Sequence, residues 1–352
     1  MVTLYDVARL AGVSTATVSR VVHGQDRVRE STRDRVREVI EQLGYVPDGA
    51  AQSLSRRRKE IVGIVCVERE SMHNDIENMS LLYYDEIVRG AGAGIRGHGW
   101  SLLINYLRGQ EEWDFPRLRS LTGKVDGLLM VEGVIATPLI AQLAEKVPVV
   151  VIAGSPQERA LDVVAVDNRA GSAALVSHLV ADHGRRRLFH VDGPPHVCDV
   201  RERRLALEQV VHAHPGCRVV GSYLGVFSVR SGVAAGETLL ANRGEGLPDA
   251  VVCANDQMAI GVLQAFNRAG VRVPEEIAVV GFDDIYPGSL SDPPLTTVHQ
   301  PMQLLGERAC ARLLDRITTP GLRQRVEVLP TELVLRASCG CPPGTATRLP
   351  TH

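Results

Sequence analysis

Apolar side chains recur at helical spacing in three stretches near the start of the chain. They stand at positions 4, 7, 8 and 11, then at 18, 21 and 22, and finally at 36, 39, 40 and 43. Intervals of three and four residues place each set on one face of a helix. The sequence therefore predicts three short helices within residues 1–46.

The residues that flank these stretches are those that begin and end helices. Side chains of Ser, Thr and Asp accept hydrogen bonds from the first turn, and Gly readily adopts the left-handed conformation that ends a helix. The predicted helix starts are Thr3 with Asp6, Ser14, and Ser31 with Asp34, and the predicted stops are Gly12, Gly24 and Gly44.

From residue 61 onward, short β-branched runs alternate with helical stretches. The runs span residues 61–67, 101–106, 127–131 and 147–154 in a first set, and residues 162–166, 187–191, 249–254 and 277–282 in a second. Near-continuous apolar strands separated by helices imply parallel sheets that are covered on both faces. We therefore predict an all-α helix-turn-helix head plus an α/β body, in which two doubly wound parallel-sheet subdomains enclose a cleft.

Charge is unevenly distributed along the chain. Residues 1–59 carry 11 Lys+Arg against 7 Asp+Glu, whereas the whole chain of 352 residues has a formal net charge of −2. The overall balance excludes a wholly basic nucleic-acid coat protein. A basic head on an acidic body is nevertheless an electrostatic pattern that fits binding to nucleic acid.

The head has the pattern of a helix-turn-helix motif, whose second helix enters the major groove of DNA. If the valines of that helix face inward, its other side presents Thr15, Ala16, Ser19 and Arg20. Arg20 can donate two parallel hydrogen bonds to a guanine edge, and Ala16 can offer a methyl contact. Groups suited to phosphate contacts are found on Thr3, Tyr5, Ser14, Ser19 and His23. A small helical bundle with a solvated polar face is the alternative.

Residues 47–60 are predicted to form a short hinge helix and linker. Asp48 can cap this helix, but a helix of that length is marginal in water on its own. Leu54 precedes the basic run 56–59, and insertion between base steps of the minor groove explains an apolar side chain in such a place. Packing of Leu54 on the body is the alternative.

Polar side chains follow several of the predicted body strands. They are Asp167, Asn255 with Asp256, and Asp283 with Asp284, while Arg201 and Arg203 come after the loop at 194–195. Ligands of parallel sheets bind beyond the carboxyl ends of the strands. Acids, an amide and an arginine that converge there suit a polyhydroxylated ligand, because hydroxyls both donate and accept. Helix capping by each acid is the alternative.

Several long segments resemble those of one known family. Residues 3–24 (TLYDVARLAGVSTATVSRVVHG) and 37–58 resemble the head and hinge of the lactose-repressor (LacI/GalR) family of bacterial transcription regulators. Residues 165–188, 253–265 and 279–301 resemble the effector-binding body of that family, which is similar to the periplasmic sugar-binding fold. The resemblance spans nearly the whole chain.

The resemblance implies a repressor that binds a palindromic double-stranded operator as a homodimer and responds to a small-molecule effector, expected to be a carbohydrate. It implies that Leu54 inserts into the operator. The residues that it places against the effector are Asp167, Arg203, Asn255 and Asp283, with Phe227 packing on the ligand.

The resemblance also implies a discontinuous body within residues 61–336. Residues 296–318 return to the first subdomain at 61–161, and residues 322–336 return to the second subdomain at 162–290. Residues 337–352 are then expected to form a flexible tail, which lacks the heptad leucines of a tetramerising coiled coil.

One segment departs from the family pattern. The family has Asn-Pro-Phe-Phe after its first body strand, where this chain has Leu81, Leu82, Tyr83 and Tyr84 after an apparent insertion at 68–80. Tyr83 and Tyr84 are the candidates to stack on the effector, with packing into the core as the alternative.

Cysteines and apolar runs limit the remaining chemistry. The seven cysteines are spread widely and imply no disulfide framework. Cys339 and Cys341 have no second pair of ligands nearby in the chain, so no metal site is predicted. No run reaches the ~18 apolar residues that span a bilayer, and no signal peptide follows Met1. We expect a cytoplasmic protein that has no cofactor and no membrane partner.

Two other functions are weighed against regulation. An enzyme acting on a sugar or nucleoside, with a vestigial head, needs a nucleophile or paired acids at catalytic spacing, and no convincing set is present. The G-x-G-x-x-G pattern at Gly92, Gly94 and Gly97 follows a helical stretch, whereas a dinucleotide site needs a strand there. A stand-alone sugar-binding protein needs a signal peptide. The sequence therefore favours a regulator without enzymatic activity.

Overall fold

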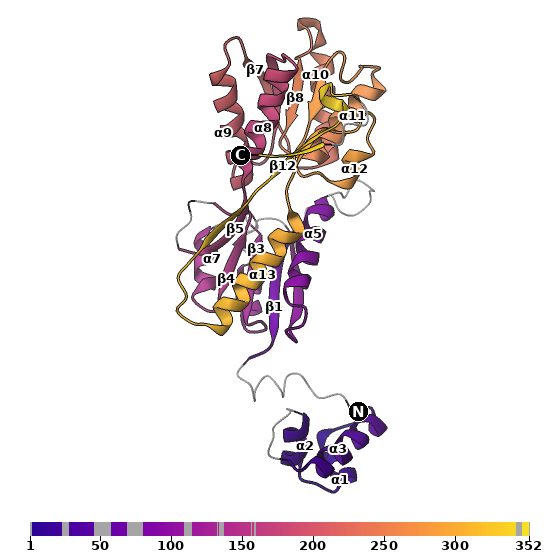
Figure 1. Cartoon of the computed structure of the whole chain (residues 1–352), viewed down its shortest axis with the longest axis vertical. Helices are drawn as coiled ribbons and strands as arrows, with labels where there is room; N and C mark the ends of the chain where they lie inside the picture. The colour runs from indigo at the N-terminus through magenta and orange to yellow at the C-terminus, as the bar shows by residue number, and fades with distance from the viewer. Residues whose placement is uncertain are drawn as a thin grey trace. The chain divides into compact units, whose positions relative to one another are not determined.

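The computed structural model of the chain describes residues 2–22, 28–45, 58–68, 80–108, 115–131, 133, 137–155, 157, 160–342 and 347–351. The chain forms two compact units, Met1–Glu60 and Ile61–His352 (Figure 1). Their boundary agrees with the predicted start of the body at residue 61. The predictions for His23, Gly24, Asp48 and Leu54 lie outside the described residues.

The head contains the predicted helices, which are α1 (Leu4–Ala11), α2 (Thr15–Val22) and α3 (Glu30–Leu43). Their apolar faces form a small separate core, in which Val7, Val18 and Val36 are fully buried. The helical spacing of apolar residues therefore fixed the fold of this unit, as expected when packing of an amphipathic face stabilises short helices.

Side chains at the helix starts confirm two of the three predicted caps. The Thr3 hydroxyl donates to the Asp6 carboxylate at 2.7 Å, and the Asp6 N–H donates to the Thr3 hydroxyl at 3.4 Å. Ser14 Oγ accepts from the Thr17 N–H at 3.2 Å. The predicted cap at Ser31 is wrong, because α3 begins upstream of it and has no side-chain cap hydrogen bond.

The first sheet of the body has the strand order β11-β5-β4-β3-β1-β2, and its described pairs are all parallel. Its strands are β1 (Ile61–Glu68), β2 (Ser101–Arg108), β3 (Gly127–Val131), β4 (Val149–Ile152), β5 (Asp162–Val166) and β11 (Val326–Leu329). The helices of this subdomain are α5 (Ser80–Gly94), α6 (Phe115–Leu121), α7 (Thr137–Ala144) and α13 (Met302–Thr318).

The second sheet has the order β7-β6-β8-β9 and is also parallel. Its strands are β6 (Arg187–Asp192), β7 (Arg218–Leu224), β8 (Ala250–Cys253) and β9 (Ala278–Val280). Its helices include α8 (Asn168–Ser177), which continues as a π-helix (His178–Asp182), and α9 (Cys198–Ala213), α10 (Val229–Ala241), α11 (Asp256–Arg268) and α12 (Tyr286–Ser289). The predicted fold class of two parallel-sheet subdomains is confirmed.

A small antiparallel sheet, in the order β10-β12-β13, was not anticipated. Its strands are β10 (Thr297–His299), β12 (Glu332–Leu335) and β13 (Thr347–Pro350). Parallel bridges join Val280 to Thr296 and Asp283 to His299, so this sheet continues from the edge of the second one.

The sheet pairing corrects three expected assignments of segments to subdomains. Strand β5 lies in the first sheet rather than the second, because it pairs with β4 and β11. Strand β11 also belongs to the first sheet, whereas β12 pairs with β10 and β13 in the small antiparallel sheet. Helix α13 returns to the first subdomain as expected, where it packs on α5, but β10, just before it, does not pair with the first sheet.

The predicted flexible tail is also corrected over its described residues. A 3-10 turn (Ala337–Cys339) buries Cys339 completely, and β13 pairs with β12. Thr351 is buried, and its hydroxyl donates to the backbone carbonyl of Thr331 at 2.8 Å. These contacts attach the end of the chain to the body.

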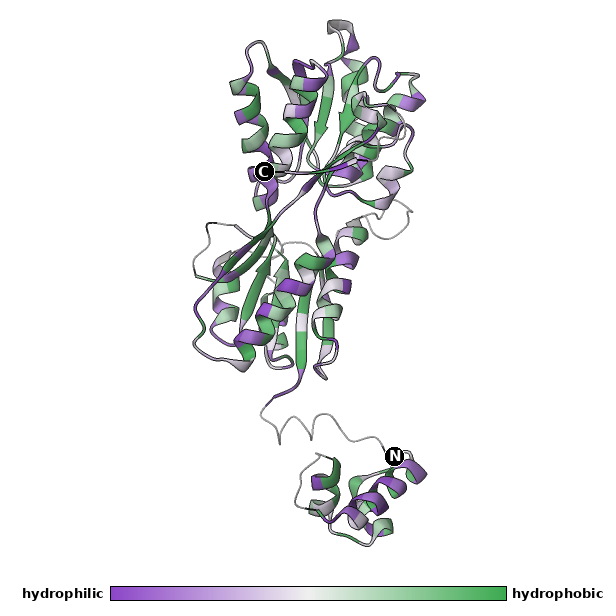
Figure 2. Cartoon of the chain, viewed as in Figure 1, coloured by the Kyte–Doolittle hydropathy of each residue, from purple (hydrophilic) through white to green (hydrophobic). Residues whose placement is uncertain are grey.

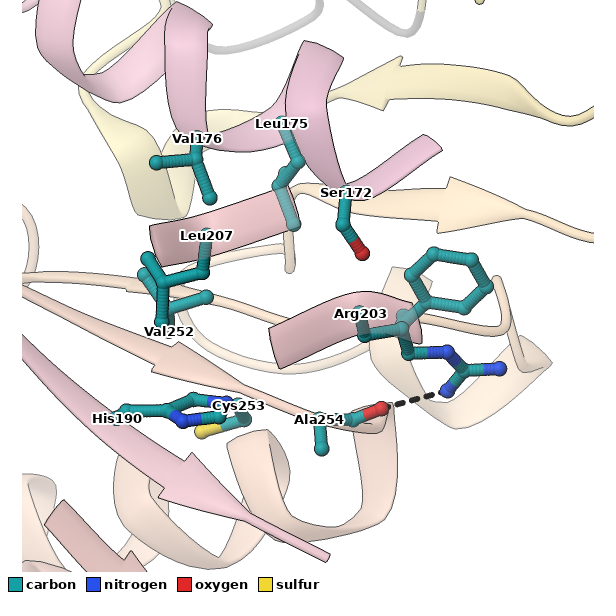
Figure 3. Close-up of a pocket in the computed structure, with 10 residues that line it drawn as sticks. Ser172, Leu175, Val176, His190, Arg203, Leu207, Val252, Cys253 and Ala254 are labelled. Carbon is teal, nitrogen blue, oxygen red and sulfur yellow. Dashed lines mark hydrogen bonds between the residues drawn. The ribbon is translucent and has the colours of Figure 1, made fainter. Parts of the chain in front are cut away.

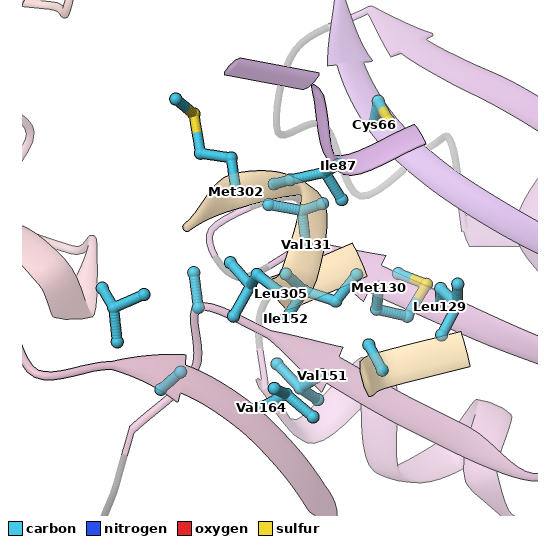
Figure 4. Packing of buried hydrophobic residues seen from close by; sticks show 14 of the residues in the cluster. Cys66, Ile87, Leu129, Met130, Val131, Val151, Ile152, Val164, Met302 and Leu305 are labelled. Carbon is cyan, nitrogen blue, oxygen red and sulfur yellow. The ribbon is translucent and has the colours of Figure 1, made fainter. Parts of the chain in front are cut away.

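The core of the body lies between the sheets and their helices, where hydrophobic strands sit beneath helices with hydrophilic outer faces (Figure 2). Figure 4 shows Ile87 of α5 and Leu305 of α13 in one buried cluster with the strand residues Met130 and Ile152. Glycines let α5 and α13 approach closely: a Cβ on Gly90 would lie 1.9 Å from the Gln303 carbonyl oxygen. No helix among the described residues is long and apolar enough to cross a membrane.

Candidate functional site

Helix α2 presents the predicted DNA-contacting residues on the side away from the core. Val18 and Val21 are buried, whereas Ala16 and Arg20 are exposed and Thr15 and Ser19 are half-buried. An arginine on the free face of a short helix has the geometry that major-groove recognition requires.

The residues predicted to contact phosphates differ in whether their side chains already make hydrogen bonds within the head. Tyr5 is 76% exposed. The hydroxyls of Thr3 and Ser14 are exposed as well, but each also holds a helix start, and Ser14 pairs with the Thr17 hydroxyl at 2.9 Å. Capping and phosphate contact are compatible for a hydroxyl, because it has one donor and two acceptor sites.

In the body, Arg203 of α9 is the centre of a buried polar network. Its Nε donates to Asn168 Oδ1 at 2.8 Å and its Nη1 donates to the Ala254 carbonyl at 2.6 Å, as Figure 3 shows for Ala254. The guanidinium carbon lies 3.6 Å from the centre of the Phe282 ring. These partners come from the start of α8 and from just after the ends of β8 and β9, so the network sits at the carboxyl ends of the second sheet.

Two buried carboxylates flank this arginine. Arg203 Nη1 lies 3.6 Å from Asp283 Oδ1, and Nη2 lies 3.6 Å from Asp199 Oδ2. Burial raises the pKa of Asp283 to about 7, against the opposing effects of Arg203 and a hydrogen bond from Gln300. Burial likewise raises the pKa of Asp199, although Arg203 and a 2.8 Å hydrogen bond from Asn168 favour its ionised form.

Gln300 completes the network and brings an unused acceptor to it. Its Nε2 donates to Asp283 Oδ1 at 2.6 Å. Its Oε1 is buried and has no hydrogen-bond partner in the part of the chain that the structure describes. A buried amide oxygen without a partner costs free energy, so a donor from a ligand or a water molecule would be favourable there. Asp283 also has a strained backbone, with φ of 123°.

Tyr83 connects this network to the other subdomain. It lies on α5, yet the charges of Asp199, Asp283 and Arg203 all act on its hydroxyl. Burial and then the two carboxylates raise the pKa of Tyr83 well above its ordinary value. Tyr84 meets Tyr83 edge to face, with ring centroids 5.5 Å apart. Both rings also pack against the core, which is the alternative weighed for the tyrosines, and their stacking on the effector stays a prediction.

The structure thus brings Tyr83, Arg203 and Asp283 together, and effector contacts of Asp167 and Asn255 stay predictions. Asp167 caps α8 by accepting from the Ala170 N–H at 2.9 Å, and Asn255 caps α11 by accepting from the Met258 N–H at 3.1 Å. These are the capping roles that were weighed as the alternative.

Phe227 is half-buried beside the same end of the sheet. Its backbone is left-handed, with φ of 61°. Its ring lies against Gly193, where a Cβ would come within 2.6 Å of the ring. The ring therefore lies just beyond the carboxyl end of β6, which ends at Asp192.

Three residues of the network, Asn168, Asp199 and Gln300, were not predicted from the sequence. Asn168 directly follows the predicted cap Asp167, and Asp199 stands four residues before Arg203, the spacing of a helical ion pair. Both signals were available. Gln300 had none, because only the bridge between Asp283 and His299 places it beside Asp283.

A cavity of about 10 Å³ lies beside Arg203 in the second subdomain (Figure 3). It is lined by polar groups of Ser172, His190 and Arg203 and by apolar side chains. Such a volume holds at most one water molecule. The cavity is therefore too small to be the ligand site.

Comparison with known proteins agrees with these features. Residues 3–48 match the family described as bacterial regulatory proteins, lacI family, and residues 176–339 match a periplasmic binding protein-like domain. The ribose operon repressor of Escherichia coli (strain K12) is 35% identical over 338 residues, which cover 94% of this chain and 98% of that protein. The PurR repressor of Photobacterium profundum is 31% identical over 343 residues, which cover 96% of this chain and 98% of that protein.

Solved structures are also similar to this chain over nearly its full length. A lac repressor dimer bound to operator and the anti-inducer ONPF superposes with a TM-score of 0.83 at 27% identity, covering 96% of this chain and 99% of that chain. The complex of the regulator CelR with cellobiose gives a TM-score of 0.69 at 33% identity, covering 96% and 100%.

A helix-turn-helix head on a periplasmic-binding-protein-like body defines a DNA-binding protein that responds to a ligand. This chain belongs to the lacI family of bacterial regulatory proteins. It is a transcriptional regulator whose operator binding is controlled by a small-molecule effector, as the resemblance implied.

Proposed function

We propose that this chain is a homodimeric repressor whose affinity for a palindromic operator is set by a sugar bound between the two subdomains of its body. The observation that carries the proposal is the unpartnered Oε1 of Gln300 in a buried network with Asp283 and Arg203. Tyr83 approaches that network from the first subdomain. A ligand that contacts both sides would therefore favour one arrangement of the subdomains over another.

The chemistry of the network favours a sugar. A hydroxyl can donate to Gln300 Oε1 or Asp283 and accept from Arg203 at the same time. We assign the aromatic rings of Tyr83 and Phe227 to covering the apolar face of a pyranose or furanose. CelR was solved with cellobiose, and the E. coli relative is a ribose operon repressor, which supports a carbohydrate. Purine bases form the second class to test in the same screen.

In the operator complex, we assign base contacts to the free face of α2 and phosphate contacts to the residues around it. Arg20 and Ala16 read base edges, with Thr15 and Ser19 beside them. Phosphate contacts are assigned to Thr3, Tyr5, Ser14, Ser19 and His23, and Leu54 is assigned to insertion in the minor groove. Two heads of a dimer would contact half-sites centred about 34–36 Å apart.

We also propose that the body binds its effector without converting it, and that the protein acts in the cytoplasm, where its operator lies. Asp199 and Asp283 both lie beside the Arg203 guanidinium, so we assign the two carboxyls to holding this arginine and the effector hydroxyls. Recovery of the unchanged effector after prolonged incubation, followed by NMR, checks this. Turnover to a product would favour the enzyme alternative.

A thermal-shift screen of the full chain identifies the effector class. The panel contains pentoses, hexoses, disaccharides and purine bases. A ligand that binds only the native state raises the melting temperature. We expect a sugar to raise it, and expect the same sugar to change operator affinity. A purine base that does both, with no sugar active, would replace the proposed effector class.

Replacement of Arg20 tests the assignment of the recognition helix. Arg20→Ala is expected to weaken operator binding by ~1–3 kcal/mol, since a bidentate contact to one base is lost. Fluorescence anisotropy on the operator and on a random duplex measures the two affinities. Arg9→Ala, on another exposed helix face, is the control. Equal losses on both duplexes would show that Arg20 contacts phosphate rather than a base.

The raised pKa of Asp283 predicts pH-dependent effector binding. Effector hydroxyls donate to the ionised carboxylate, so affinity should rise with pH up to about 7 and fall as much as ~10-fold per pH unit below it. Calorimetric titration at about pH 6, 7 and 8 measures this, and Asp283→Asn should remove the dependence. A wild-type affinity that is constant across this range would contradict the assignment.

The raised pKa of Asp283 also affects the stability of the ligand-free protein. A carboxyl with a folded-state pKa above its unfolded value binds its proton more tightly in the folded state. The Asp283 contribution to the free energy of unfolding should therefore decrease as pH rises from about 4 to about 7.

A further inference from the structure

Four nitrogen and sulfur ligands converge at the end of helix α8. His178 lies in the π-helix that continues α8, His183 follows that turn, and Cys339 and Cys341 come from the segment after β12. Their four ligand atoms all lie within 4.8 Å of one another. His178 and Cys339 are buried, and the other two are half-buried. In the chain, the two pairs are about 160 residues apart, which is why no metal site was expected from the sequence.

Four of the six distances among the ligand atoms are close to those of one tetrahedral ion. Nε2 of His178 and Nε2 of His183 are 3.1 Å apart. The sulfur atoms of Cys339 and Cys341 each lie 3.5 Å from His178 Nε2, and Cys341 Sγ lies 3.6 Å from His183 Nε2. Zinc bonds of about 2.0 Å to nitrogen and about 2.3 Å to sulfur give tetrahedral edges of roughly 3.3–3.6 Å for these pairs. A site of this size holds a single ion rather than a cluster.

Surrounding groups orient the ligands as in a metal site. His178 Nδ1 is 2.7 Å from Asp182 Oδ2, which directs Nε2 toward the cysteines. A carboxylate behind a histidine ligand is the common arrangement in zinc proteins. The Thr296 hydroxyl donates to Cys339 Sγ at 3.1 Å, and such a hydrogen bond favours the thiolate form that binds metal.

The backbone on both sides of the cluster also has conformations that bring the four ligands together. The i→i+5 turn at 178–182 is a π-helix, which is rare and found mostly at functional sites. Between the cysteines, Gly340 has φ of 115°, and a Cβ there would lie 3.1 Å from the His183 ring. A glycine at this position therefore lets both thiols face the histidines.

We propose that His178, His183, Cys339 and Cys341 bind one Zn²⁺ ion. Tetrahedral coordination by two sulfur and two nitrogen ligands favours zinc over hard cations such as Mg²⁺. Four protein ligands leave no open position, so the ion is structural and not catalytic. It attaches the C-terminal segment to α8, the helix whose first residue, Asn168, holds Arg203 in the candidate effector site.

Metal analysis of the full-length chain, purified without a histidine tag and under reducing conditions, tests the proposal. We expect one zinc ion per chain after dialysis. Cys341→Ser and His183→Gln should each lose it, and circular dichroism verifies that they are folded. Cys217→Ser is the matched control, because Cys217 is also a free, half-buried cysteine but lies outside the cluster. Loss of zinc from the control as well would overturn the assignment.

Two measurements on the wild-type chain do not depend on the variants. Exchange of Co²⁺ into the site should give the visible absorption of tetrahedral cobalt with thiolate ligands. A chelator should lower the melting temperature of the wild-type chain and leave that of Cys341→Ser unchanged, because metal binding stabilises the folded state. A wild-type chain that retains no zinc after incubation with ZnCl₂ and dialysis would show a hydrogen-bonded cluster without a metal role.

Discussion

Replacement of Arg203 by alanine should lower the free energy of unfolding by ~3–5 kcal/mol and abolish the response to effector, because removal of one partner leaves buried charges uncompensated. Arg203 is 6% exposed and lies between Asp199 and Asp283. Without it, both carboxyls must either stay ionised in an apolar site or take up protons. The hydrogen bonds to Asn168 and the Ala254 carbonyl are lost as well.

Urea denaturation of the full chain measures this loss. Arg201→Ala is the matched control, since Arg201 lies on the same helix and donates to the His196 carbonyl at 2.8 Å but is exposed. It should change stability by less than about 1 kcal/mol. If Arg203→Ala were as stable as the control, the network would contribute little to the fold, and its role would have to be found in binding alone.

Replacement of Asp283 by asparagine should weaken effector binding by ~2–5 kcal/mol while operator binding without effector is unchanged. The substitution keeps the shape of the side chain and removes its charge. It therefore acts on the ligand more than on packing. The neutral amide leaves Arg203 with one fewer anion and offers the effector hydroxyls a weaker acceptor.

Calorimetric titration with the sugar found by thermal shift measures the change in affinity. Asp315→Asn removes a carboxylate from the exposed side of α13 and is expected to bind the sugar like the wild-type chain. Wild-type affinity in Asp283→Asn would remove Asp283 from the effector site, and the assignment of Gln300 and Arg203 would then lose its main support.

Local features of the fold were predictable from the sequence where short-range physics decides them. The head helices, the caps at Thr3 and Ser14, and the apolar runs of the parallel strands all follow from spacing and side-chain type. Asp283 was noticed because it directly follows an apolar strand, and the family resemblance placed both Asp283 and Arg203 against the effector.

Tertiary placement was not predictable in the same way. An apolar run such as 162–166 suits the interior of either sheet, so its pattern does not say that β5 pairs with β4 and β11. The small sheet of β10, β12 and β13 depends on segments that return from the end of the chain. For the same reason, neither Gln300 beside Asp283 nor the histidines beside Cys339 could be inferred from neighbours in the sequence.

Operator affinity with and without effector tests most directly whether the Arg203–Asp283 network controls the head. A genomic fragment selected by the wild-type chain is titrated by anisotropy in the absence and presence of the sugar. The wild-type affinity should change by ~5–150-fold, the usual range of coupling between two sites, whereas Asp283→Asn should bind the fragment equally well and show no change. A variant that responds to the same sugar concentration as the wild-type chain would contradict the account.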